Sequence, residues 1–183
     1  MSRIPIPASI EATPAASHAL LEAVKKQLGS VPNLFRLTAT SPAALEGYLS
    51  LSGALGKGAL SPPTRERIAL AVAQINGCGY CLAAHTYLGK NIAKLDADEI
   101  AANRAGKSSD ARADAAVRFA VKVASQRGAV AEADLGFVKA AGYSDAEIIE
   151  IVAHVALNTL TNYINEVFKT EIDFPKVDMA LAA

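Results

Sequence analysis

The sequence predicts an all-α domain. About a fifth of the 183 residues are alanine, the residue with the highest helix propensity. Aromatic residues make up 5% of the chain and Trp is absent, which disfavours a β-sandwich built on aromatic and β-branched pairs. Hydrophobic residues at 51% and charged residues at 20% are sufficient for a buried core. We therefore expect packed helices that fold alone or as an oligomer.

The charge balance excludes several kinds of partner. The chain has 18 basic and 18 acidic residues, so no net charge attracts nucleic acid or an anionic membrane. Every apolar run is interrupted before it reaches the roughly 18 residues that a membrane span needs. Residues 1–10 lack the apolar segment of a secretory signal. We expect a cytoplasmic protein that binds neither nucleic acid nor membranes.

The first third of the chain divides into an arm, a helix and a connector. Residues 1–15 are rich in Pro and Ile, which predicts an extended arm over the body or over a neighbouring subunit. Residues 16–183 then form a single all-α domain. Its first helix is expected over Ala16–Leu28, because apolar side chains recur on one face and Gly29 ends the pattern. We interpret Val31–Phe35 as a connector.

Capping residues and prolines place the other helices. The second helix is expected over Pro42–Leu55, before a Gly-Lys-Gly sequence. Ser61 followed by two prolines starts a third helix that runs to about Ile75. A fourth helix starts at the two cysteines and ends near Gly89. Further helices are expected after Asp96, after Asp110 as far as Gln126, near Glu132–Ala140, and from Ser144 to Phe168.

The two cysteines are the most informative feature of the sequence. They lie three apart as Cys78-Gly-Tyr-Cys81, and His85 follows four residues later. A tight Cys-x-x-Cys pair in a cytosolic chain indicates redox or metal chemistry. On a helix, Cys81 and His85 share one face, so the imidazole can take the thiol proton. Glu66 lies twelve residues before Cys78, and a helix–turn–helix would return its carboxylate toward the thiols for proton relay.

These residues resemble the active-site signature of the alkylhydroperoxidase-D-like branch of the carboxymuconolactone decarboxylase family. The shared pattern is Glu66-x11-Cys78-x-x-Cys81-x-x-x-His85, and the resemblance covers about Pro42–Lys90. The Asn-rich last helix fits the peroxidase-related subgroup of that family. The resemblance implies an AhpD-like helical bundle that assembles as a homotrimer or homohexamer.

The resemblance also implies a thiol peroxidase. Cys81 would attack the hydroperoxide and become a sulfenic acid, and Cys78 would resolve it into a disulfide. His85 would activate Cys81, and Glu66 would relay protons. No bound cofactor is implied; a lipoyl- or thioredoxin-type dithiol would restore the thiols.

Tyr80 departs from the family pattern, because well-known members carry a histidine there. A phenol is a poor general base at neutral pH, although Tyr80 could still orient a substrate or a thiolate. Two alternatives therefore stay open: an oligomeric module that binds zinc through Cys78, Cys81 and His85, and a decarboxylase or lactone-processing enzyme that keeps the thiols.

The last expected helix carries a polar stripe on an otherwise apolar surface. Such a stripe needs hydrogen-bond partners at a subunit interface or at the edge of a pocket. We favour structural hydrogen bonding, with His154 as a supporting residue of the site. The loose likeness between the starts of the third and last helices leaves an internal helical repeat open. The stripe consists of His154, Asn158, Thr161, Asn162 and Asn165.

Overall fold

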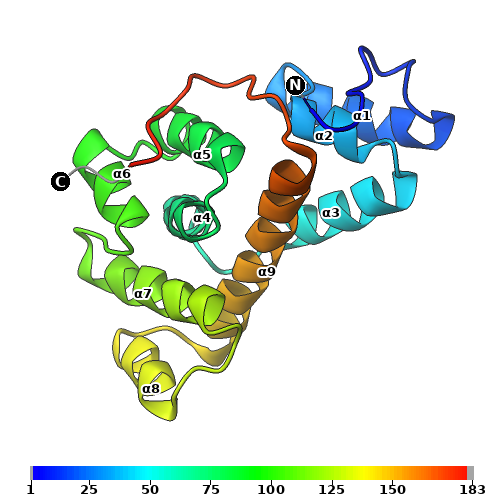
Figure 1. Cartoon of the computed structure of the whole chain (residues 1–183). Coiled ribbons are helices and arrows are strands. Elements are labelled where there is room, and N and C mark those ends of the chain that lie inside the picture. The colour runs from blue at the N-terminus through cyan, green and yellow to red at the C-terminus, as the bar shows by residue number, and fades with distance from the viewer. Residues whose placement is uncertain (1, 181–183) are drawn as a thin grey trace.

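The computed structural model describes residues 2–180, which form nine α-helices and no strand. The all-α prediction is therefore confirmed. Within these residues, no helix is long and apolar enough to cross a membrane. The helices are α1 (Ala15–Leu28), α2 (Asn33–Thr38), α3 (Pro42–Leu55), α4 (Pro62–Ile75), α5 (Gly79–Asn91), α6 (Ala97–Arg104), α7 (Ala111–Ser125), α8 (Glu132–Ala140) and α9 (Asp145–Phe168) (Figure 1).

Helix α4 lies at the centre of the fold. It packs against α5, α6, α7 and α9, and Figure 1 shows it end-on between them. One hydrophobic core joins it to α7, α8 and α9 through side chains such as Ile68 and Ile151. A second core joins it to α5 and α6 through Leu70 and Leu82. Because α4 is buried on several faces, the side chains that it presents to α5 and α9 have fixed positions.

Capping side chains define most of the helix starts, as the sequence predicts. Each capping oxygen accepts a hydrogen bond from a backbone N–H in the first turn of the following helix. Prolines occupy the first positions of α3 and α4, where the missing N–H group costs nothing. The capping residues are Ser41, Ser61, Asp96, Asp110 and Ser144.

One predicted element is wrong. The expected connector Val31–Phe35 contains the start of α2, a six-residue helix that buries Leu34 and Leu37. So short a helix shows too few apolar positions to reveal a period. The fourth helix, predicted to end near Gly89, ends two residues later at Asn91.

The two ends of the chain have no regular structure within the described part, and both lie on the helices. In the N-terminal segment, the Arg3 N–H donates to the Phe168 carbonyl at 2.7 Å, and Ile10 is buried beside α1 and α3. Residues 169–180, which we call the C-terminal segment, run from α9 across α5 toward α6 (Figure 1). This segment covers the amino end of α5.

Candidate active site

The turn between α4 and α5 places the two thiols at the start of a helix. Asn76 ends α4, Gly77 adopts a positive φ of 65°, and Cys78 is the N-cap residue of α5. The Cys78 sulfur accepts a hydrogen bond from the Cys81 N–H at 3.2 Å. Both thiols are free. They lie within one turn at the start of α5, where the positive end of the helix dipole favours a thiolate.

The two thiols have opposite acidities. A hydrogen bond with Cys78, the charge of His85 and hydrogen bonds from Asn165 and Asn162 lower the pKa of Cys81 to about 7, although burial opposes this. The hydrogen bond with Cys81 and burial raise the pKa of Cys78. Cys81 is thus the sulfur that ionises near neutral pH, and Cys78 keeps its proton.

Glu66 and His85 form a direct pair across the α4–α5 interface. The Nδ1 atom of His85 lies 2.9 Å from Glu66 Oε2, and both side chains are about one-fifth exposed. Burial alone would lower the pKa of His85, but the charges of Glu66 and Cys81 and the hydrogen bond to Glu66 raise it. The pair therefore favours an imidazolium beside the Cys81 thiolate.

Two residues outside the predicted set also reach the thiol. Asn165 on α9 is 2% exposed, and its Nδ2 donates to Cys81 Sγ at 3.2 Å. Tyr48 on α3 lies close enough to Cys81 and Glu66 for their charges to raise its pKa, after the larger effect of burial. In the sequence, Tyr48 reads only as part of the apolar face of its helix, and Asn165 only as part of the polar stripe.

Tyr80 anchors the C-terminal segment. Its hydroxyl donates to Asp173 Oδ1 at 2.8 Å and accepts the Leu34 N–H at 3.2 Å. The Phe174 ring packs edge-on against it, with ring centroids 5.7 Å apart. A Cβ atom added to Gly79 would lie 3.3 Å from the Met179 sulfur, so this segment also contacts the start of α5. Tyr80 thus fixes the C-terminal segment against the start of α5, where the two thiols lie.

His154 is near the site without contacting the thiols. It is 5% exposed, and its Nε2 has no hydrogen-bond partner among the residues described. Burial and the charge of Arg65 lower its pKa, against the opposing charges of Glu150 and Glu66. The neutral imidazole of His154 therefore lies on α9, near enough to Glu66 for that charge to act on it.

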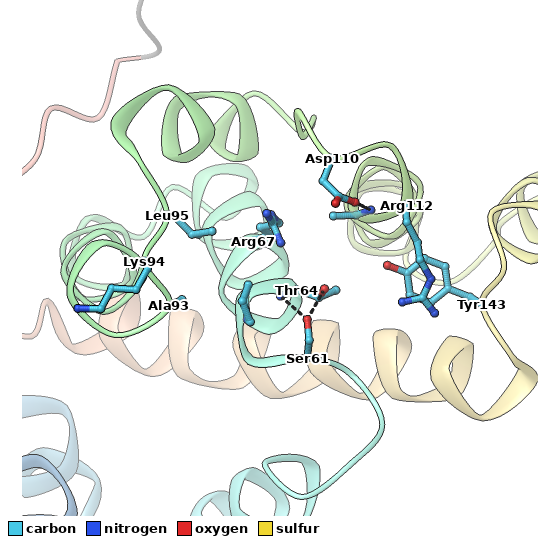
Figure 2. A pocket seen from close by; sticks show the side chains of 11 residues that line it. Ser61, Thr64, Arg67, Ala93, Lys94, Leu95, Asp110, Arg112 and Tyr143 are labelled. Atoms are coloured by element: carbon cyan, nitrogen blue, oxygen red, sulfur yellow. Dashed lines mark hydrogen bonds between the residues drawn. The ribbon is translucent and has the colours of Figure 1, made fainter.

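A pocket of about 320 Å³ lies on another face of α4 (Figure 2). Neither cysteine nor His85 lines it. Its two arginines are already paired: Arg67 Nε lies 2.6 Å from Glu99 Oε1, and Arg112 Nη2 lies 2.7 Å from Glu147 Oε1. We therefore regard this pocket as separate from the thiol site.

The zinc alternative requires a cluster of ligands. Among residues 2–180, no group of three or more His, Cys, Asp or Glu side chains has the arrangement of a metal site. Cys78 and Cys81 are instead hydrogen-bonded to each other, and His85 is paired with Glu66.

Sequence comparison agrees with the resemblance found in the motif. Residues 42–126 match the Carboxymuconolactone decarboxylase family. This range contains Glu66, His85 and both cysteines. No curated protein sequence matches the chain.

Solved structures share the fold over nearly the whole chain. The alkylhydroperoxidase AhpD core of an uncharacterized peroxidase-related protein from Ralstonia eutropha JMP134 matches with a TM-score of 0.83 and 29% identity, covering 94% of this chain and 92% of that one. A peroxidase-related protein from Silicibacter sp. TM1040 matches with a TM-score of 0.80 and 24% identity, covering 93% and 91%. The apo debrominase Bmp8 matches with a TM-score of 0.76 and 19% identity, covering 91% and 90%. The family match over residues 42–126 and the shared architecture show that this chain is similar to the carboxymuconolactone decarboxylase family and has the AhpD-like all-α fold.

Proposed function

We propose that the chain is a thiol peroxidase that reduces hydroperoxides through a Cys78/Cys81 dithiol–disulfide cycle. The observation that carries this proposal is the placement of two adjacent thiols at the start of α5, with the Cys81 N–H hydrogen-bonded to the Cys78 sulfur at 3.2 Å and with the His85–Glu66 pair on the same helix interface. A thiolate is the nucleophile in peroxide reduction, and a protonated neighbour is in place to resolve the product. The likeness to peroxidase-related proteins supports an antioxidant role.

In the first step, the Cys81 thiolate attacks the terminal oxygen of the hydroperoxide. An S–O bond forms and the O–O bond breaks, so sulfur is oxidised to a sulfenic acid and the peroxide is reduced. The leaving alkoxide takes a proton from the His85 imidazolium, and an alcohol departs. Glu66 keeps the imidazolium charged until that transfer.

In the second step, Cys78 transfers its proton to His85 and attacks the Cys81 sulfenic acid. An S–S bond forms, and hydroxide leaves with the proton from His85 as water. One hydroperoxide and two thiols thus yield one alcohol, one water and one disulfide.

An external dithiol then closes the cycle by exchange with the Cys78–Cys81 disulfide. We propose a lipoyl- or thioredoxin-type donor, because no other thiol exists in the chain. Turnover supported by dihydrolipoamide and not by reduced thioredoxin identifies the lipoyl class, and the reverse result identifies the other.

We also propose that the chain acts as a homotrimer or homohexamer. An apolar stripe on α9 supports association, because these side chains are between 42% and 70% exposed in the single chain. Light scattering coupled to size exclusion gives the subunit number, and a monomer at micromolar concentration contradicts this proposal. The stripe consists of Ile149, Val152, Leu160, Tyr163 and Val167.

The direct test of the function is hydroperoxide-dependent oxidation of a dithiol. Cys81→Ser is expected to abolish it, and unchanged activity would remove the proposal. In Cys78→Ser, a sulfenic-acid probe is expected to label Cys81 after one equivalent of hydroperoxide. Turnover of carboxymuconolactone with intact thiols would favour the decarboxylase alternative, and stoichiometric zinc in protein purified without chelator would favour the metal-binding one.

A further inference from the structure

Two buried carboxamides on α9 lie near the Cys81 sulfur. Asn165 Nδ2 donates to Cys81 Sγ at 3.2 Å, and Asn162, one turn earlier, lies near enough to lower the pKa of this thiol. Asn162 is fully buried and Asn165 is 2% exposed. Buried amides with no role would be costly, because each N–H group needs a partner away from water.

We propose that Asn162 and Asn165, which we call the amide pair, select Cys81 rather than Cys78 as the attacking sulfur by holding its thiolate. This inference rests on the proposed peroxidase cycle, in which the amide pair would contact the reacting atom. It concerns the nucleophile itself, so it can be measured without any peroxide.

The turn that carries the thiols also orients Asn162. The Nδ2 of Asn76 donates to Asn162 Oδ1 at 2.8 Å. With its oxygen engaged as an acceptor, Asn162 can offer only N–H groups on its other side. Its Nδ2 has no hydrogen-bond partner among the residues described, so this N–H group is free to turn to a thiolate on Cys81. Asn76 lies two residues before Cys78, so the motif and α9 are directly connected.

The amide pair treats the two sulfurs unequally. Cys81 accepts the side-chain N–H of Asn165 from α9, whereas Cys78 accepts, among residues 2–180, the backbone N–H of Cys81. Both sulfurs are almost completely buried, at 0% and 3% exposure, so water cannot solvate either anion. Donors that favour one buried anion over the other therefore decide where the negative charge resides.

The other charged and polar groups around the sulfurs act in fixed directions. His85 on α5 favours a Cys81 anion, and its partner Glu66 on α4 neutralises part of that effect. Glu166 on α9 disfavours an anion on Cys78. Tyr48 on α3 is neutral. The amide pair contributes no charge of its own, so its effect is separable from theirs by neutral substitution.

The test measures the acidity of Cys81 in the Cys78→Ser background, where one thiol remains and the serine hydroxyl still donates. Thiolate absorbance is followed against pH with and without Asn165→Leu. We expect the pKa of Cys81 to rise by about one unit, which is about tenfold less thiolate below that pKa. Asn162→Leu removes the second amide without adding a charge, and it is expected to shift the pKa in the same direction.

Asn158→Leu is the matched control. Asn158 is a buried asparagine on the same helix, but its Nδ2 donates to the His154 carbonyl and not to a thiol. It is expected to leave the Cys81 pKa unchanged. Circular dichroism confirms the fold of each variant, and the smaller neutral change Asn165→Ala replaces Asn165→Leu if the latter does not fold.

A second readout uses the wild-type pair of thiols. Iodoacetamide at neutral pH is expected to modify Cys81 in preference to Cys78, and peptide mass spectrometry measures the ratio. Loss of that preference in Asn165→Leu supports the amide pair. An unchanged Cys81 pKa in folded Asn165→Leu and Asn162→Leu would overturn the inference even if peroxidase activity is present. A shifted pKa in a protein without peroxidase activity would leave the inference standing and overturn the proposed function.

Discussion

The two walls of the thiol site differ in how far they lie from the cysteines in the chain. One wall comes from α4 and α5, where Glu66 and His85 bracket the thiols within twenty residues. The other comes from α9 and the C-terminal segment, about ninety residues later, and supplies Asn165 and the Asp173 partner of Tyr80. The near wall holds groups that can move protons, whereas the far wall holds groups that only donate hydrogen bonds or cover the site. Substitutions in the near wall should therefore change the chemistry most.

The largest effect outside the cysteines is expected at His85. His85→Ala removes both the proton donor to the leaving alkoxide and the charge that favours the Cys81 thiolate, which should lower kcat/KM for hydroperoxide about 100- to 10,000-fold. Steady-state oxidation of the dithiol measures this. His18→Ala is the matched control, since His18 contacts only the Thr13 carbonyl of the N-terminal segment. Equal activity of both variants would remove His85 from the mechanism.

A smaller, pH-dependent effect is expected for Glu66→Gln. Without the carboxylate, burial dominates and the pKa of His85 falls. The rate rises with pH as Cys81 ionises and falls as His85 loses its proton, so the alkaline limb should move to lower pH and the maximum rate should drop about tenfold. The pH profile of kcat/KM measures both. Glu46→Gln, on the exposed side of α3, should reproduce the wild-type profile. An alkaline limb at its original position in Glu66→Gln would contradict the pairing.

The smallest effect on chemistry is expected at Tyr80, the α5 residue that holds the far wall in place through Asp173. Tyr80→Phe removes the hydrogen bonds to Asp173 and from Leu34, which should destabilise the fold by about 1–3 kcal/mol. Chemical denaturation measures this loss, and the Cys81 pKa should stay close to its wild-type value. Tyr87→Phe is the control, because the Tyr87 ring also contacts Phe174 but is 44% exposed. A large loss of peroxidase activity in Tyr80→Phe at unchanged stability would assign Tyr80 to the chemistry instead.

The near wall was predictable because local rules determine it. The spacing of Cys81 and His85 is one helical turn, and the break at Gly77 follows from its positive φ, so both thiols and the imidazole share the start of α5. The central position of α4 then returns Glu66 to that turn. The carboxylate meets His85 rather than a sulfur, which the spacing alone did not specify.

The far wall was not predictable from local pattern. Asn165 and His154 share one face of α9, so which of them lies at the thiol depends on where along α9 the start of α5 packs, and the cores around Leu82 and Ile151 determine that position. The sequence showed a polar stripe and favoured His154 as the supporting residue of the site. In the structure, Asn165 is the residue of the stripe that bonds to Cys81. Tyr48 likewise depends on where α3 packs against α9.

The predicted domain limits, reductant, subunit number and internal repeat stay predictions. The first helix and the helices with capping residues could be predicted from local sequence alone. The all-α fold could be predicted from the composition and from the spacing of apolar residues. The six-residue α2 shows the limit of such signals, since burial of Leu34 and Leu37 forms it rather than any local period.

One measurement tests the central claim most directly: free thiols counted before and after one equivalent of hydroperoxide, with peptide mass spectrometry of the product. The account predicts the loss of both thiols per chain and a disulfide between Cys78 and Cys81 within the same chain. Two thiols that persist, or a disulfide that joins separate chains, would contradict it.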